Sequence, residues 1–144
     1  MPPHDFADAG LVTLPSAHTV SETVVCLKAV LAEKGIHLFA HIDHAAEAAN
    51  VGLSLRPTQV LIFGNPKAGT PLMQSEQIIG LDLPLRMLVW EDVMGHVWLT
   101  YTEPHYMARH YRITDREKEV TALGASLTAV VHAVTSPPEA PASP

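Results

Sequence analysis

The feature that most constrains the fold is a helix signature followed at once by a strand signature. Thr19 and Glu22 have the spacing of a capping box, in which a hydroxyl and a carboxylate satisfy free backbone N–H groups. Apolar residues then recur at helical spacing on one face: Val20, Val24, Leu27 and Leu31. Gly35 is the expected stop, because glycine accepts the left-handed conformation there. These signals predict a helix over about residues 20–34.

The next segment, residues 36–42, alternates between apolar and other side chains and predicts a strand. The alternation assigns one face to Ile36, Leu38, Ala40 and Ile42 and the other to His37, Phe39 and His41. The alanine-rich residues 43–50 follow, and they predict a short helix with Asp43 as a possible cap.

Three further strands and a last helix are indicated downstream, and residues 10–14 form a candidate first strand. Apolar residues over 59–63 predict a central strand, and residues 85–91 and 96–101 predict a hairpin. A second capping-box spacing, Thr114 with Glu117, opens the last helix. Its apolar stripe is Val120, Leu123, Leu127, Val130, Val131 and Val134.

This order of elements, β-α-β(4)-α, predicts a two-layer α+β domain. Two main amphipathic helices are expected on one face of a mostly antiparallel sheet. A chain of 144 residues fits a single core. We expect a polar lead-in over residues 1–9, one domain over 10–134, and an extended, mobile, proline-rich tail over 135–144.

The charge balance excludes several classes of partner. Nine basic residues among fifteen acidic ones give a net charge of −6, which supplies no stripe for nucleic acid and no polybasic membrane surface. No apolar run is long enough to span a bilayer. Cys26 is the only cysteine, so an intramolecular disulfide is impossible, and the first ten residues lack a secretory signal pattern. We therefore expect a cytoplasmic protein with no nucleic-acid and no membrane partner.

The stretch "IFGNPKAGTPLM", residues 62–73, is the best candidate for a site. Glycines at 64 and 69 and prolines at 66 and 71 predict a shaped loop at the exit of a strand. Asn65 offers an acceptor and two donors, and Thr70 offers a hydroxyl. If the following segment is helical, Thr70 would be its N-cap, and the N–H groups near Gly69 would form an anion nest. Alternatively, Asn65 and Thr70 bond their own backbone and brace a turn or a dimer contact.

The histidines do not have the spacing of metal ligands. His41 and Asp43 point the same way on a strand, about 7 Å apart, which is long for a shared ion, and His44 joins them only if the turn folds back. We therefore expect a capping Asp43 with surface histidines and no metal, and a metal site built on His41, Asp43 and His44 is the less favoured alternative. The sequence does not identify a cofactor.

Several motifs together resemble the domain of unknown function 302 family, over roughly residues 18–112. They are Ile42–Ala45, Leu55–Thr58, Phe63–Pro66, Gly69–Met73 and Asp82–Leu85. The resemblance implies a compact α+β domain similar to the TATA-binding-protein-like architecture, usually met as a homodimer, with no established activity. Such an architecture does not bring DNA binding with it. A sister branch carries cysteines where this chain has Gly64 and Leu85, so no thiol or soft-metal role carries over.

Three functional hypotheses follow. The first is a cytoplasmic homodimer that binds a small ligand through Asp43, His44, Asn65, Gly69 and Thr70. The second is an enzyme of small metabolites that uses His44 as acid or base, oriented by Asp43 or Asn65. The third is an interaction protein with no ligand.

Overall fold

The computed structural model describes residues 5–136, and a five-stranded sheet in the order β1-β5-β4-β3-β2 forms its centre. All neighbouring strands are antiparallel. The strands are β1 (Leu11–Ser16), β2 (His37–Asp43), β3 (Thr58–Gly64), β4 (Leu85–Glu91) and β5 (Val97–Thr102). Strands β2 to β5 follow the chain as a meander, and β1 pairs with β5, so β1 and β2 are the edges of the sheet.

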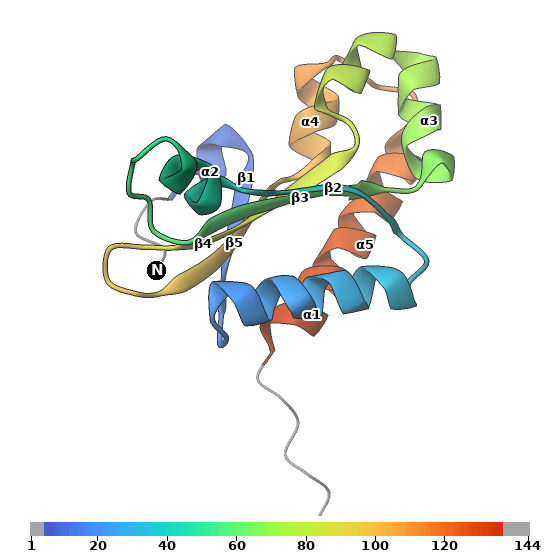
Figure 1. Ribbon diagram of the computed structural model, residues 1–144. Coiled ribbons are helices and arrows are strands. Elements are labelled where there is room, and N and C mark those ends of the chain that lie inside the picture. Colours follow the sequence, from blue (N-terminus) through green and yellow to red (C-terminus); the bar gives the residue numbers. More distant parts are fainter. Residues whose placement is uncertain (1–4, 137–144) are drawn as a thin grey trace, which may run out of the picture.

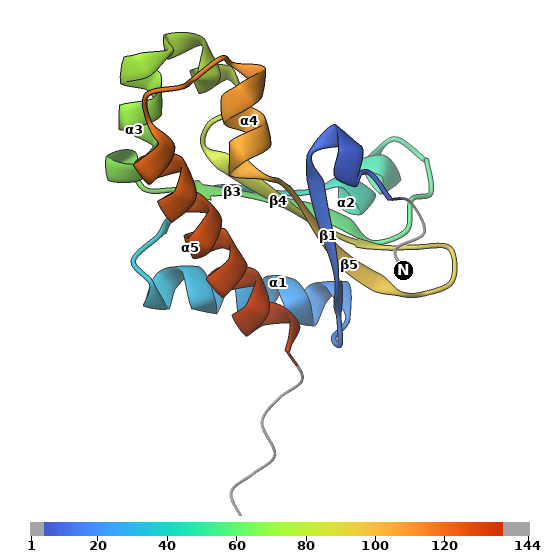
Figure 2. The same ribbon diagram turned by 180° about the vertical axis from the view of Figure 1, so that it is seen from behind.

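Two long helices, α1 (Val20–Glu33) and α5 (Glu117–Thr135), cover the same face of the sheet (Figure 1, Figure 2). The predicted α+β class with two main helices on one face is confirmed. Shorter helices occupy the connections: η1 (Ala7–Ala9), α2 (His44–Asn50), α3 (Pro66–Ser75), η2 (Gln77–Asp82) and α4 (Pro104–His110). In Figure 1 and Figure 2 alike, α2 and α3 lie at opposite ends of the sheet.

Helix α1 begins and ends where its sequence signals predict. The Thr19 side chain accepts a hydrogen bond from the backbone N–H of Glu22, and Gly35 has a φ of 69° just beyond the end. The predicted stripe of Val20, Val24, Leu27 and Leu31 is buried. Burial of one such leucine contributes about 1.5–3 kcal/mol relative to exposure, so this face fixes α1 to the sheet.

Helix α5 buries its whole predicted stripe, but its predicted capping box is wrong. The helix begins at Glu117, with Arg116 at the N-cap position and no side-chain cap. The segment before it is tied to α3 instead. Arg116 Nε donates to the carbonyl oxygen of Pro71 at 3.0 Å, and Ser75 Oγ donates to Asp115 Oδ1 at 2.5 Å. These contacts hold residues 115–116 outside the helix.

The two predicted ends of the chain are described only in part. Of the predicted tail, Thr135 is the last residue of α5, and residues 137–144 lie outside the described residues. Of the predicted lead-in, residues 1–4 lie outside them, and residues 7–9 form η1.

A bulge in β2 overturns the predicted face assignment of that strand. Leu38 pairs with Phe63, and Ala40 pairs with the next residue along β3, Ile62, so Phe39 is the extra residue. One extra residue in a strand of period two turns all later side chains to the other face. Leu38 is half-buried on the helix-covered side of the sheet with Phe63, whereas Ala40 lies on the opposite side.

Candidate functional site

The loop predicted at residues 64–71 is mostly helix. Helix α3 begins at Pro66, a favourable first position because proline has no N–H to leave unsatisfied. Asn65 is the N-cap, and its Oδ1 accepts a hydrogen bond from the backbone N–H of Lys67 at 3.0 Å. Gly69 and Thr70 therefore lie inside the helix.

The predicted anion nest at Gly69 and Thr70 is wrong for the same reason. The helix N-terminus lies earlier in the chain, and its amide groups are already engaged. The backbone N–H groups of Ala68 and Gly69 donate to the carbonyl oxygen of Asn65, at 2.8 and 3.1 Å. With the Lys67 N–H bonded to the Asn65 side chain, the first turn of α3 has no spare donor to offer an anion.

A pocket of about 180 Å³ nevertheless lies against this helix. It is open on one side and is lined by the end of β3, by α3, by the segment before β4 and by single residues from β2 and α5. Its lining is Phe39, Gly64, Asn65, Pro66, Ala68, Gly69, Thr70, Met73, Leu83, Pro84, Leu85 and Leu123. Asn65 and Thr70 are the only residues of this lining with polar side chains.

Both polar side chains keep hydrogen-bonding capacity for a ligand. The Asn65 carboxamide uses its oxygen as the helix cap, which leaves its Nδ2 group as a donor. Within residues 5–136, neither Asn65 Nδ2 nor Thr70 Oγ1 has a hydrogen-bonding partner. Three of the sequence candidates, Asn65, Gly69 and Thr70, thus meet in one pocket.

A second compartment of about 420 Å³ adjoins the first along α5. Both compartments are lined by Gly64, Asn65, Ala68, Leu85 and Leu123. The second compartment lies between the end of α1, the start of α3 and residues 119–130 of α5. Its charged lining residues are Lys34, Lys67 and Glu119.

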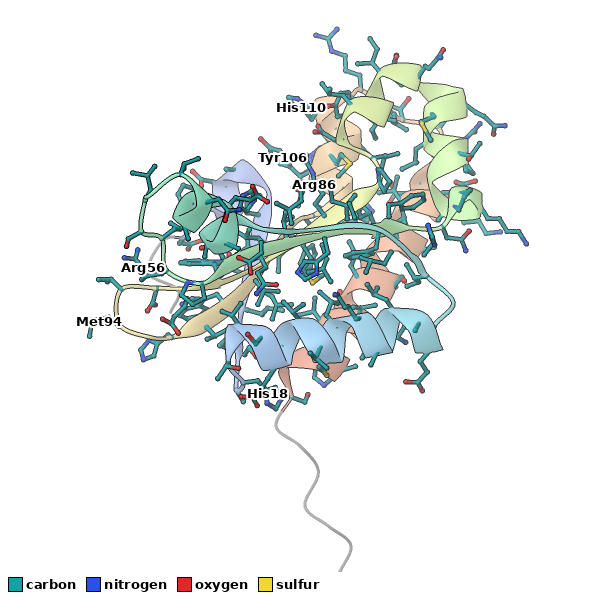
Figure 3. The ribbon with its side chains drawn as sticks, viewed as in Figure 1. His18, Arg56, Arg86, Met94, Tyr106 and His110 are labelled. Carbon is teal, nitrogen blue, oxygen red and sulfur yellow. The ribbon has the colours of Figure 1, made fainter. Side chains whose placement is uncertain are left out.

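Asp43 and His44 do not join this site. In the β2–β3 pair, His37 lies opposite Gly64, whereas Asp43 lies opposite Gln59. The five residue steps from Gln59 to Gly64 correspond to about 17 Å along the strand. Arg56 and Met94 lie at the same end of the sheet as α2, far from α3 (Figure 1, Figure 3). A catalytic pair of His44 and Asn65 is therefore wrong, because proton transfer needs hydrogen-bond reach.

The residues at the α2 end have local structural partners. Asp43 Oδ1 caps α2 by accepting from the Ala46 N–H at 2.9 Å, as its sequence position predicts. His41 Nε2 lies 2.6 Å from Gln59 Oε1, and the side chain of His44 is exposed. Within residues 5–136 no three metal-binding side chains are grouped as a site.

A polar cluster that sequence reasoning missed joins α4 to α5. The His105 ring lies 3.1 Å from Glu103 Oε1 and 3.0 Å from Glu117 Oε1. The hydrogen bonds to Glu103 and then to Glu117 raise the pKa of His105. Burial alone would raise the pKa of the Glu103 carboxyl, but hydrogen bonds from His105 and Tyr106 outweigh it and lower that pKa. This cluster lines neither compartment and acts as a clasp between helices.

The distant lining residues were also beyond sequence reasoning. Phe39 reaches the pocket because of the β2 bulge, and Leu123 because α5 packs beside α3. Their own signals, an alternating strand and a helical stripe, show which faces are buried but not which elements meet.

The chain is similar to proteins named as ion channels. It is 46% identical over 112 residues, 78% of its length, to fluoride-specific ion channel FluC 1 from Brucella suis biovar 1 (strain 1330), over 44% of that protein. FluC 2 from Brucella melitensis biotype 1 matches at the same identity, over 42% of its length. The chain thus spans less than half the length of these curated relatives. Among residues 5–136, no helix is long and apolar enough to cross a membrane.

The fold is similar to that of a solved structure, and the sequence matches a family model. The crystal structure of an uncharacterized conserved protein DUF302 from Bacillus stearothermophilus matches with a TM-score of 0.78. The match covers 87% of this chain and 98% of that one, at 16% identity, and it supports the α+β fold. The model of the family described as "Domain of unknown function DUF302" matches residues 12–134. This chain therefore belongs to the DUF302 family.

Proposed function

We propose that this domain binds a small, largely apolar molecule in the pocket beside α3. The observation that carries the proposal is an apolar pocket whose only polar side chains, Asn65 and Thr70, keep hydrogen-bonding groups that no residue of 5–136 occupies. Ligand sites combine such apolar walls with a few polar groups that set orientation. Asn65 Nδ2 would donate to a ligand oxygen, and Thr70 Oγ1 would donate or accept.

The size of the pocket limits the ligand. Its volume of about 180 Å³ is slightly larger than the ~150 Å³ of an engineered cavity that admits benzene. A single ring with a short polar substituent would fill this pocket, and a larger molecule would extend into the second compartment.

A fragment screen with a blocked variant tests the proposal. A Cβ at Gly69 would meet Leu83 Cδ1 at 3.7 Å, an ordinary contact, so Gly69→Leu should fold and place its side chain in the pocket. Gly124→Leu is the matched control, because a Cβ on that α5 glycine meets nothing within 4 Å. Fragments that bind the wild type and the control should lose at least tenfold in affinity on Gly69→Leu. Equal affinity for all three proteins would contradict the proposal.

The enzyme and the interaction protein remain as alternatives with different support. Enzymatic use of His44 now rests on Asp43 alone, and that carboxylate is occupied as the cap of α2. A pure interaction protein would need no pocket, and it predicts that the screen finds no fragment sensitive to Gly69→Leu.

A homodimer remains part of the proposal. The edge strand β2 leaves its outer side without a partner strand within residues 5–136, and exposed apolar side chains lie on or near it. Phe39 is 50% exposed, and Val51, Leu53 and Leu55 follow α2 with similar or greater exposure. Exposed edges with apolar neighbours favour pairing with a second copy. Light scattering tests this, with twice the monomer mass expected and the monomer mass contradicting it.

The matches to named fluoride channels favour a second candidate function. We infer that this domain type acts beside a channel segment, because the match covers less than half of each relative. Deleting the matched segment from the Brucella suis relative should lower fluoride efflux from vesicles, and adding this chain should restore it. Efflux that is insensitive to the deletion would contradict this candidate.

The location that we propose is the cytoplasm. Its support is the single free thiol of Cys26, since disulfide-stapled domains are typical of oxidising compartments. Cell fractionation of a tagged chain tests the location, and recovery outside the cytoplasmic fraction would contradict it.

A further inference from the structure

We propose that the ligand is an amphipathic organic monoanion, a carboxylate on an apolar body. The apolar body lies in the two neighbouring compartments beside α3, and the carboxylate lies between Lys34 and Lys67. This inference rests on the proposed function and names the class of molecule that the site accepts.

The two compartments are neighbours with shared walls. They share wall residues from four elements: Gly64 at the end of β3, Asn65 and Ala68 at the start of α3, Leu85 at the start of β4 and Leu123 on α5. Together they extend from Met73, which lines the first pocket, to Lys34 at the end of α1, which lines the second compartment. A site of this form fits an elongated molecule better than a compact one.

Most of the residues that line the second compartment are apolar. Phe63, Leu127 and Val130 are each exposed by 2% or less, so they belong to the packed core. Ile36 and Leu123 are less completely buried. Covering the exposed part of these walls with a ligand's hydrocarbon favours binding by about 25 cal/mol per Å² before the costs of association. Of its charged residues, Lys34 and Lys67 are exposed and Glu119 is partly buried.

Two lysines are among the residues that line the second compartment. Lys34 follows the last residue of α1, and Lys67 lies in the first turn of α3. Neither forms an ion pair within residues 5–136, whereas Arg86 pairs with Asp82 and Arg116 with Asp115. The chain as a whole has a net charge of −6, so a compartment lined by these two lysines is more positive than the rest of the protein. Ligand carboxylates are attracted to such a lining.

The charge count favours a monoanion over a dianion. The lining contains Lys34, Lys67 and one carboxylate, Glu119 on α5, so its charged groups sum to about +1. A phosphate monoester would bring nearly two negative charges beside Glu119. The backbone N–H groups that usually hold phosphates at a helix start are already bonded to Asn65 in α3. A single carboxylate matches the net charge of about +1 of this lining.

Titration calorimetry with octanoate and its neutral counterpart octanamide tests the inference. The full chain should bind octanoate more tightly than octanamide, and raising the salt concentration should narrow the difference. Lys34→Gln and Lys67→Gln should each weaken octanoate binding about two- to fivefold and leave octanamide unchanged. Glu119→Gln should strengthen octanoate binding by a similar factor, because it removes a like charge. Lys28→Gln, an exposed α1 lysine that lines neither compartment, is the matched control.

The possible outcomes separate this inference from the proposed function. Equal affinity for octanoate and octanamide, with both lost in Gly69→Leu, would contradict the preference for a monoanion but would support the proposed ligand pocket. An octanoate affinity that is unchanged by Lys34→Gln, Lys67→Gln and Gly69→Leu would show that octanoate binds elsewhere, and it would overturn the inference. The absence of octanoate binding would overturn it as well, and the fragment screen with Gly69→Leu would then decide the proposed function on its own.

Discussion

The side chain of Asn65 caps the start of α3 by accepting a hydrogen bond from the N–H of Lys67, and its amide nitrogen has no hydrogen-bonding partner among residues 5–136; the same residue lines the pocket. One residue thus caps the helix and offers a donor to a ligand. The two roles use different atoms of the carboxamide, so substitutions can separate them.

The first prediction separates the cap from the donor. Asn65→Asp keeps an oxygen for the Lys67 N–H and should leave the free energy of unfolding nearly unchanged, because aspartate caps helices as well as asparagine does. Asn65→Ala removes the cap and should cost about 1 kcal/mol. Urea denaturation measures both. Both variants should lose fragment affinity, and a normal affinity in Asn65→Asp would show that Nδ2 is not used.

The second prediction concerns Gly10, which lies under the ring of Tyr106. A Cβ at Gly10 would overlap the ring atoms of Tyr106, and the residue has a φ of 78°. Gly10→Ala combines left-handed strain with a clash and should cost about 2–5 kcal/mol. Gly52→Ala is the control, because Gly52 has the same φ and a Cβ there would meet nothing within 4 Å. It should cost about 1–2 kcal/mol. Denaturation of both variants measures this, and equal losses of stability would argue against the contact with Tyr106.

The third prediction is a pH dependence at the clasp of His105 with Glu103 and Glu117. The raised pKa of His105 contributes stability that is complete below its unfolded value near 6.5 and is lost as the pH rises through the folded value. The lowered pKa of Glu103 contributes stability above its unfolded value near 4.5 that is lost as the pH falls through the folded value. The stability difference between wild type and His105→Gln should therefore be largest between pH 4.5 and 6.5.

The size of that difference should not exceed about 1 kcal/mol, because the His105 side chain is about one third exposed. Denaturation at about pH 5.5 and about pH 9 measures it, and an NMR titration of the ring reports the pKa directly. A difference that grows toward the alkaline end would contradict the sign of the prediction.

The fourth prediction uses the two capping-box threonines as a matched pair. Thr19→Ala removes the cap of α1 and should cost about 0.5–2 kcal/mol. Thr114→Ala should change stability by less than about 0.5 kcal/mol, because α5 begins at Glu117 and Thr114 does not cap it. Thermal unfolding of both variants checks this. A larger loss for Thr114→Ala would place the start of α5 earlier in solution.

Local signals predicted the elements well because they depend on neighbouring residues. The helix signature from Thr19 to Gly35 and the cap at Asp43 reproduce what the structure shows. The failures occurred where tertiary contacts decide. Arg116 and Asp115 bond to α3, which sequence spacing does not reveal, and the extra residue at Phe39 reverses the faces of β2.

The candidate site was predicted in part for a similar reason. Asn65, Gly69 and Thr70 are close in sequence and meet in one pocket, although on a helix and not a loop. Asp43 and His44 are grouped with them in the sequence because all of these residues follow the ends of predicted apolar strands, where ligand sites tend to collect. The antiparallel register of β2 with β3 places them at the far end of the sheet, and register is not visible in the sequence.

The most direct test of the central claim is an NMR map of amide shifts on the full chain, titrated with the fragment that raises its melting temperature most. The account predicts shifts that concentrate at Gly64, Asn65, Ala68, Gly69 and Thr70 and that vanish in Gly69→Leu. Shifts concentrated at Asp43 and His44, or no saturable shifts at α3, would contradict it.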